Sequence, residues 1–159
     1  MNKLALRDLI LTQLRSELAL QTRAAQLSRD EAISEESKPE NQYDMHSQEA
    51  AYLAEGQGRL AAEIAASIAL YETMVISPVE SDSGVVVGAV VAVEHAERRT
   101  SYFIGPRAGG LEIGIEGTTV LVLTPQSPLG RELLGKRVGD SVRVQTRTGF
   151  VTHRVVEVT

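Results

Sequence analysis

Acidic side chains gather in one short part of the sequence. Residues 30–49 hold seven carboxylates against a single base, Lys38, and Pro39 interrupts the stretch near its middle. Carboxylates at this density suit two roles, namely ligation of a hard metal ion or simple solvation of a turn. The stretch is the first candidate for chemistry, and its acids are Asp30, Glu31, Glu35, Glu36, Glu40, Asp44 and Glu49.

Other kinds of site find little support in the sequence. The chain has no cysteine, which excludes disulfides, thiolate catalysis and cysteine-ligated zinc. His46, His95 and His153 fall in three different predicted elements and lack ligand spacing such as i, i+4, so we expect no metal site of the protein's own. Residues 105–110 fit neither a Walker loop nor a dinucleotide fingerprint, and we expect a turn there.

Composition limits the location and the partners. With 159 residues, 43% of them hydrophobic, the chain suits one ordinary domain or two small units. A formal net charge of -5 argues against a general phosphate-backbone binder, so we expect weak or no independent binding to nucleic acid. No apolar run approaches the roughly 20 residues that span a bilayer, and the N-terminus has no apolar signal region. We therefore expect a cytoplasmic protein with no membrane partner.

Two long helices are predicted on either side of the acidic stretch. Apolar residues that recur every seven positions predict one helix over about residues 3–35 and another over about residues 39–74. A short polar break between helices of similar length favours an antiparallel coiled-coil hairpin, which we assign to residues 1–76. The predicted seam residues are Leu4, Leu11, Leu14, Leu18, Ala25, Leu27 and Ala32 in the first helix and Leu53, Leu60, Ile64, Tyr71 and Met74 in the second.

The remainder of the chain alternates as strands do. We assign residues 77–83 to a linker and residues 84–159 to a second domain, because proline and glycine open a valine-rich region with period-2 patterning. Serine, proline and glycine at positions 127, 128 and 135 predict one short helix with its cap. The chain is therefore predicted to be α+β, with a helical hairpin followed by an antiparallel sheet. Strands are predicted at 85–93, 100–104, 119–124, 141–146 and 150–158, with a turn at 97–99.

The sequence resembles one known family in both parts. Residues 124–140, Thr-Pro-Gln-Ser-Pro-Leu-Gly-Arg-Glu-Leu-Leu-Gly-Lys-Arg-Val-Gly-Asp, closely resemble the C-terminal domain signature of bacterial Gre-type (GreA/GreB) transcription elongation factors. Glu40-Asn41, followed by Tyr43, resembles the tip of the same family's N-terminal coiled coil. The resemblance covers both domains in the family's order, and it implies that the second domain is FKBP-like.

The resemblance also implies a partner and an activity. A Gre-type factor docks on bacterial RNA polymerase through its C-terminal domain, and its coiled coil enters the secondary channel. There the tip carboxylates help to hold Mg²⁺ and an attacking water at the nascent RNA 3′ end, so that the polymerase cuts its own backtracked transcript. The factor is then not an enzyme itself, and the Mg²⁺ belongs to the polymerase active site rather than to a cofactor of its own. The docking residues implied here are Ser127, Pro128, Leu129, Gly130 and Arg131.

The tip departs from the family pattern at one position. Cleaving members carry Asp-x-x-Glu-Asn, whereas Ser37 stands at the Asp position of this chain, followed by Glu40 and Asn41. Ser37 with Glu40 is predicted to form a capping box, and Pro39 suits a first helical turn, so these residues are predicted to shape the tip. Lys38 is the alternative cap, because the residue before a proline avoids the α region. Glu40 is the principal candidate to face the metal. The possible assisting carboxylates are Glu35, Glu36 and Asp44.

Three functions stay open on the sequence. The first is a polymerase-binding factor that stimulates transcript cleavage. The second is a secondary-channel regulator that docks without cleaving and competes with Gre factors, which Ser37 favours. The third is an FKBP-like peptide-binding or prolyl isomerase module with a coiled-coil arm. This third function has weak support, because a proline pocket relies on aromatic walls and the second domain offers only Tyr102, Phe103 and Phe150.

Overall fold

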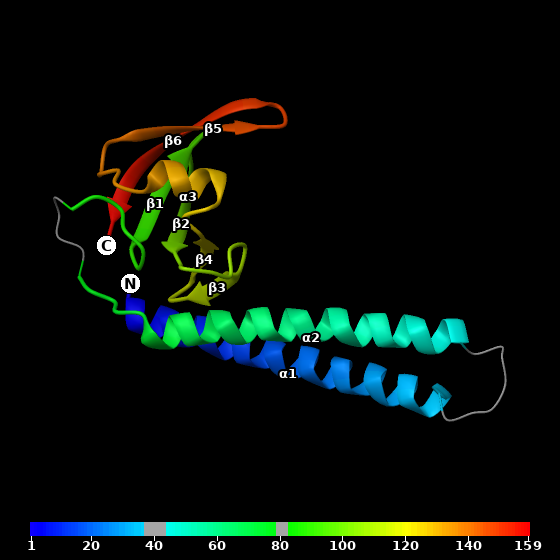
Figure 1. Ribbon diagram of the computed structural model, residues 1–159. Coiled ribbons are helices and arrows are strands. Elements are labelled where there is room, and N and C mark those ends of the chain that lie inside the picture. Colours follow the sequence, from blue (N-terminus) through cyan, green and yellow to red (C-terminus); the bar gives the residue numbers. More distant parts are fainter. Residues whose placement is uncertain (37–43, 79–82) are drawn as a thin grey trace. The chain divides into compact units, whose positions relative to one another are not determined.

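The two long helices precede all the strands along the chain, and the α+β class is confirmed (Figure 1). The computed structural model describes residues 1–36, 44–78 and 83–159. The helices are α1 (Lys3–Glu36), α2 (Asp44–Thr73) and α3 (Pro128–Leu133). The strands are β1 (Val90–His95), β2 (Arg98–Ile104), β3 (Glu112–Ile115), β4 (Thr118–Leu123), β5 (Ser141–Thr146) and β6 (Gly149–Val158).

Two compact units make up the chain. One unit joins Met1–Ile10 to Leu70–Thr159, and the other consists of Leu11–Ala69. The first unit therefore contains the sheet together with the beginning of α1 and the end of α2. The predicted boundaries after residues 76 and 83 stay predictions.

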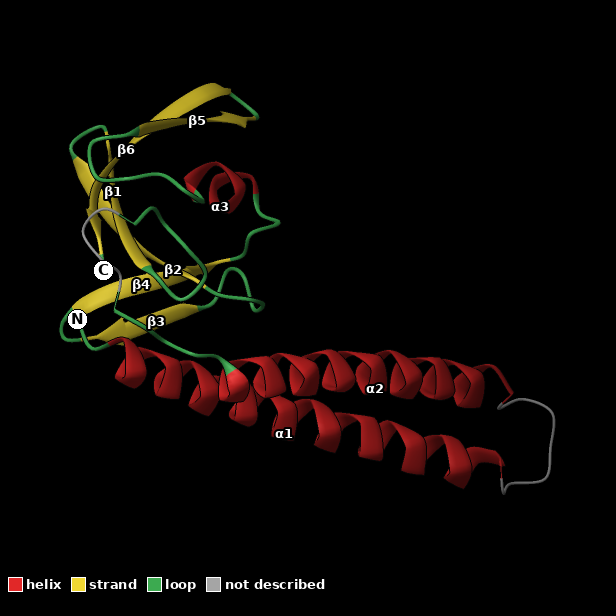
Figure 2. Cartoon of the chain, turned by 60° about the vertical axis from the view of Figure 1, so that its left-hand side comes forward, coloured by secondary structure: helices red, strands yellow, loops and turns green. Residues whose placement is uncertain are grey.

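The long helices form an antiparallel pair, lying side by side in both views (Figures 1 and 2). Helix α1 begins where the Asn2 side chain accepts hydrogen bonds from the amides of Leu4 and Ala5, at 3.0 and 3.1 Å. This cap satisfies amides that have no partner within the helix. Among the described residues, no helix combines the length and apolar composition that a bilayer span requires.

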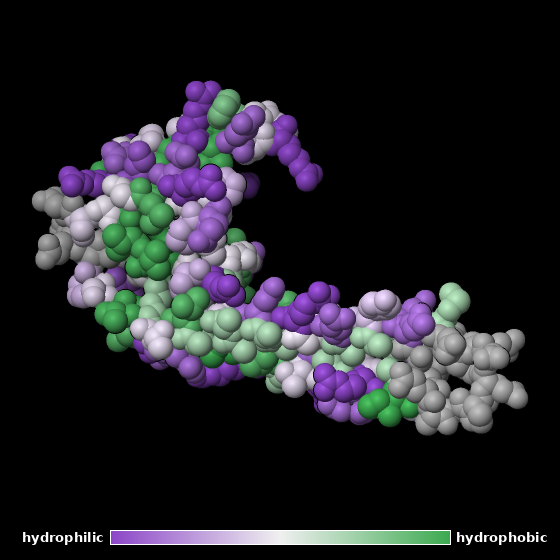
Figure 3. Space-filling model, viewed as in Figure 1, coloured by the Kyte–Doolittle hydropathy of each residue, from purple (hydrophilic) through white to green (hydrophobic). Residues whose placement is uncertain are grey.

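The seam between the helices is only partly the predicted one. Leu27 and Leu53 are 64% and 55% exposed, and Leu4 and Leu60 are also exposed, so their assignment to the seam is wrong. A strict seven-residue repeat drifts around a helix of 3.6 residues per turn, and the neighbouring Ser28 and Ala54 are buried in place of Leu27 and Leu53. Along the helices in Figure 3, weakly hydrophobic residues lie beside hydrophilic ones. The predicted seam residues that are buried are Leu11, Leu14, Ala32, Ile64 and Tyr71.

A single six-stranded sheet forms the second half of the chain, in the order β3-β4-β2-β1-β6-β5. Four of its pairings are antiparallel, as predicted, but β2 and β4 run parallel. The chain leaves β2, forms β3 at the sheet edge and then returns as β4 between β3 and β2. This return direction makes β4 parallel to β2, and it corrects the prediction of a wholly antiparallel sheet.

Three strand details also differ from the prediction. β1 begins at Val90 rather than at residue 85, because Gly88 takes a positive φ of 92° and turns the chain out of the extended conformation. The β1–β2 turn consists of Ala96 and Glu97, both with positive φ, whereas it was predicted at residues 97–99. This is the backbone twist that a two-residue hairpin requires. β3 was missed because it has only four residues and contains a glycine.

Apolar side chains are buried on both faces of the sheet. On one face Leu133 of α3 packs with Val91, Val93, Val142 and other buried residues, so α3 covers this face of the sheet (Figure 2). Elsewhere in the same unit, the ring of fully buried Phe103 stacks on that of Tyr71, with the centroids 6.4 Å apart. The end of α2 is thereby part of the core of the sheet unit.

Candidate functional site

The acidic stretch occupies the ends of the two long helices and the segment between them. Glu35 and Glu36 are the last two residues of α1, and Asp44 is the first residue of α2. The predicted tip residues Ser37, Pro39, Glu40 and Asn41 lie outside the described residues, as does the predicted start of the second helix at residue 39.

The start of α3 is built around one serine. Ser127 has φ −67° and ψ 149°, and its Oγ accepts a hydrogen bond from the Gly130 amide at 3.0 Å. The same hydroxyl donates to the Thr124 carbonyl at 2.8 Å, while Pro128 occupies the first turn, where its missing amide hydrogen is not needed. These contacts confirm the predicted cap and define the start of the short helix.

Gly130 sits against the segment that leads into α3. A Cβ atom at this position would lie 2.1 Å from the Thr124 carbonyl oxygen and 2.7 Å from Ser127 Oγ. Neither contact can relax easily, because one partner is backbone and the other is the capping hydroxyl. Only glycine fits here, which explains its place in the Ser-Pro-Leu-Gly run by packing alone.

The five predicted docking residues differ in what they present to solvent. Pro128 and Arg131 are exposed, Ser127 and Leu129 are half-buried, and Gly130 is buried. The Arg131 guanidinium reaches the Gln126 carbonyl at 3.4 Å. Pro128 and Arg131 are therefore the two of the five that can offer most side-chain surface to a partner, while Ser127 and Gly130 hold the backbone in shape.

Close backbone contacts also fix the end of α3. The Gly135 amide donates to the Val85 carbonyl at 2.8 Å, and the Val85 amide donates to the Lys136 carbonyl at 2.8 Å. A Cβ at Gly84 would lie 2.3 Å from the Gly135 carbonyl oxygen, so this approach also requires glycine. Gly135, at φ 76°, ends the helix as predicted.

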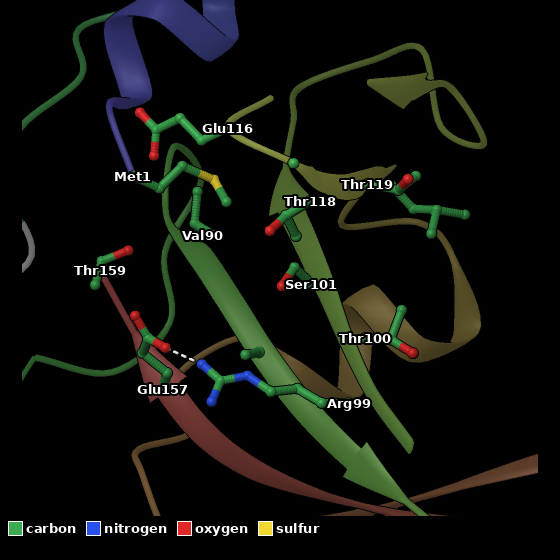
Figure 4. A pocket seen from close by; sticks show the side chains of 13 residues that line it. Met1, Val90, Arg99, Thr100, Ser101, Glu116, Thr118, Thr119, Glu157 and Thr159 are labelled. Atoms are coloured by element: carbon green, nitrogen blue, oxygen red, sulfur yellow. Dashed lines mark hydrogen bonds and ion pairs between the residues drawn. The ribbon is translucent and has the colours of Figure 1, made fainter. Parts of the chain in front are cut away.

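A polar cavity of about 790 Å³ opens over strands β1, β2, β4 and β6 (Figure 4). Arg99 of β2 and Glu157 of β6, which form an ion pair, both line it. The hydroxyl groups of Ser101 and Thr118 line it as well. None of the predicted docking or tip residues lines this cavity, which offers hydrogen-bonding groups.

Two histidines also meet on the sheet, which the sequence prediction missed. The rings of His95 and His153 have centroids 5.3 Å apart. Burial, and then the neighbouring His95, lower the pKa of His153 below its ordinary value. The sequence gives no sign that these two histidines meet, because the pairing of β1 with β6 brings together residues that are far apart in the sequence.

The aromatic residues of the second domain do not gather into one wall. Phe103 is fully buried, whereas Phe150 is 57% exposed beneath the Arg143 guanidinium, 4.0 Å from its ring centroid. Tyr71 donates its hydroxyl hydrogen to the Arg107 carbonyl at 2.8 Å, and burial raises its pKa. Phe103 and Tyr71 therefore serve the core.

The fold and the candidate sites define a class of protein, in which a helical hairpin with acidic residues at its far end is joined to a small α+β domain carrying a serine-capped helix. Comparison of the sequence with known families agrees with this. Residues 80–159, half of the chain, match the family described as "Transcription elongation factor, GreA/GreB, C-term". The chain belongs to the GreA/GreB family of transcription elongation factors, and the resemblance drawn from residues 124–140 is confirmed.

Individual relatives carry the same description. The transcription elongation factor GreA of Syntrophobacter fumaroxidans is 35% identical over 91 residues, covering 55% of this chain and 54% of the relative. GreA of Cereibacter sphaeroides is 34% identical over 105 residues, covering 64% and 63%. The chain thus spans less than two thirds of the length of both relatives. Among solved structures, the GreA factor homolog 1 (Gfh1) protein of Thermus thermophilus aligns over 94% of each chain, with 22% identity and a TM-score of 0.38.

Proposed function

We propose that the protein binds bacterial RNA polymerase, inserts its helical hairpin into the secondary channel and stimulates cleavage of backtracked RNA. The observation that carries the proposal is the family match over residues 80–159, in a chain whose helical hairpin concentrates acids at one end. The second domain would dock through the surface around Pro128 and Arg131. The protein would not be an enzyme by itself, because the reacting RNA and the catalytic ion belong to the polymerase complex.

Glu40 is the proposed metal-facing residue. Mg²⁺ prefers oxygen ligands, and one added carboxylate can stabilise a weakly held ion. In the described part of the chain no three His, Cys, Asp or Glu side chains lie together as a metal site. In this proposal the polymerase holds the ion and the chain adds only a carboxylate.

A cleavage assay with stalled elongation complexes tests this role. The native chain should release short RNA from the 3′ end, and Glu40→Gln should slow this release by about 100-fold, which corresponds to roughly 3 kcal/mol of lost transition-state stabilisation. Glu63→Gln removes the same charge from an exposed position of α2 and should cleave like the native chain. If the native chain releases no RNA, the cleavage role is wrong.

Docking is measured separately from cleavage. Arg131→Glu reverses an exposed charge on α3 and should weaken binding to polymerase by about tenfold. Arg147→Glu makes the same reversal in the exposed β5–β6 turn and serves as the control. Glu40→Gln should bind as the native chain does. Equal binding by both arginine variants would place the docking surface elsewhere.

A non-cleaving regulator is the second candidate function, and Ser37 is the observation that favours it. A protein that docks but lacks one tip carboxylate would occupy the channel and compete with cleaving factors. Ser37→Asp restores the family pattern at this position, so it should create or raise cleavage activity while binding stays the same. If Ser37→Asp leaves an inactive protein inactive, the loss of one carboxylate does not explain the inactivity.

A further inference from the structure

The ends of strands β1 and β6 bring two imidazole rings to one cavity. His95 is the last residue of β1, and His153 lies in β6 beside it. Their ring centroids are 5.3 Å apart and their planes are inclined by 50°. Both rings line a cavity of about 340 Å³ together with Val93, Ala96, Arg98 and Thr100.

The hydrogen bond of His95 determines which ring nitrogen is free. Its Nδ1 lies 3.0 Å from the Thr152 carbonyl oxygen. A carbonyl oxygen only accepts hydrogen bonds, so Nδ1 must carry the hydrogen and donate it. The neutral ring then keeps a lone pair on Nε2. This is the arrangement of metal-binding histidines, in which the second nitrogen donates to a backbone carbonyl or a carboxylate.

His153 has an unusual nitrogen of its own. Its Nδ1 is buried and has no hydrogen-bond partner within the described residues. Buried polar atoms without a protein partner are rare, and an ion or a water molecule bound at the atom is one explanation for such a case. The ring therefore carries unused bonding capacity next to a neighbour that is oriented for ligation.

The spacing of the rings fits a shared ion. Metal–nitrogen bonds of about 2.1 Å and imidazole rings of about 1.1 Å radius put the centroids about 5.2 Å apart when two rings share one tetrahedral ion. We propose that His95 and His153 form an open two-histidine site for a late first-row divalent ion, namely Zn²⁺, Ni²⁺ or Cu²⁺. Imidazole nitrogen suits these ions, whereas Mg²⁺ prefers oxygen ligands.

The remaining coordination positions belong to exogenous ligands. No third His, Cys, Asp or Glu of the described residues completes a metal-binding group here, so the site binds its ion through two protein nitrogens and water. Arg98 lines the same cavity, and its positive charge repels a bare cation. It favours an ion that carries hydroxide or another small anion. Such an ion links β1 to β6 beside the β1–β2 turn.

Metal titration of the full, tag-free chain tests the site. After treatment with EDTA and dialysis, the protein is titrated with Zn²⁺ at pH 7.5 in a calorimeter. We expect one ion per chain, and at least about tenfold weaker binding for both His95→Gln and His153→Gln. His46→Gln changes the third histidine of the chain and should bind like the native protein. Protons compete for imidazole, so binding should weaken as the pH falls from 7.5 to 5.5.

A second measurement on the native chain does not depend on the folding of the variants. Paramagnetic Ni²⁺ should broaden the imidazole NMR signals of His95 and His153 before those of His46. An excess of Mg²⁺ should not restore these signals. The proposal is overturned if the native chain takes up no Zn²⁺ at millimolar concentration, if both glutamine variants bind as it does, or if Ni²⁺ broadens all three histidines equally.

Discussion

Gly130 is the residue at which the start of α3 leaves no room for a side chain. Gly130→Ala would force a Cβ to within 2.1 Å of the Thr124 carbonyl oxygen, so that the backbone before the helix would have to move. We expect the free energy of unfolding to fall by about 2 kcal/mol or more, as in other overpacked sites. Urea unfolding followed by circular dichroism measures this.

Gly114→Ala is the matched control for that change. Gly114 lies in β3 and takes no positive φ, and a Cβ atom added to it would have no neighbouring atom within 4 Å. The same added methyl should therefore alter the free energy of unfolding by less than about 1 kcal/mol. Equal losses in the two variants would show that the close approach to Thr124 is not what requires glycine.

The pKa of His153 makes the free energy of unfolding depend on pH. Burial and the adjacent His95 lower its pKa in the folded protein below the ordinary 6.5, so the unfolded chain binds a proton at higher pH than the folded one does. The free energy of unfolding should then fall as the pH drops from neutral through 6.5 towards the lowered pKa.

Unfolding of the native chain and of His153→Gln in EDTA, at several pH values between 8 and 5, checks this dependence. The stability of the native chain relative to the variant should decline on the acidic side. A difference that stays constant, or grows as the pH falls, would contradict the assigned direction of the pKa shift.

At the scale of elements, one polar pair interrupts the seam of the hairpin. Ser28 is only 8% exposed, and its hydroxyl donates to the Gln57 side-chain oxygen at 3.0 Å across the two helices. Ser28→Ala leaves the side-chain oxygen of Gln57 without this donor, and we expect the free energy of unfolding to fall by about 1 kcal/mol. Thermal unfolding followed at 222 nm, which reports mainly on the helices, measures the loss.

Ser16→Ala makes the same substitution at an exposed position of α1. Alanine has the higher helix propensity, so this variant should be as stable as the native chain or slightly more stable. If Ser28→Ala behaves in the same way, the hydrogen bond to Gln57 contributes nothing measurable to the hairpin.

The helices also show what periodicity predicts and what it leaves open. Their existence and most of their lengths followed from composition and apolar spacing, since α1 ends at Glu36, within a residue of the prediction. The inward face did not follow, because Leu27 and Leu53 point outward while Ala54 and Ser28 are buried. Alanine-rich helices carry little contrast between faces, so the partner helix decides which stripe is covered.

For the molecule as a whole, Tyr71 ties the end of α2 into the core of the sheet unit. Its hydroxyl donates to the Arg107 carbonyl at 2.8 Å, and its ring stacks on Phe103. Tyr71→Phe keeps the ring but removes the donor, so the free energy of unfolding should fall by about 1–1.5 kcal/mol. Thermal unfolding of the full chain measures this change.

Tyr52→Phe is the control at this scale. Tyr52 is 74% exposed on α2, so loss of its hydroxyl should leave the free energy of unfolding within about 0.5 kcal/mol of the native value. If the two variants lose equal stability, the buried hydrogen bond is not the cause, and the coupling between α2 and the sheet rests on the ring alone.

The sequence by itself determined the family, the helix–strand order and the capped α3, because all of these depend on local signals. Ser127, Pro128 and Gly135 act within a few residues of one another, and their roles in α3 came out as predicted. Only the tertiary structure decided the parallel β2–β4 pair and the meeting of His95 with His153. Strand pairing joins residues that are distant in sequence, and no local pattern specifies which strands become neighbours.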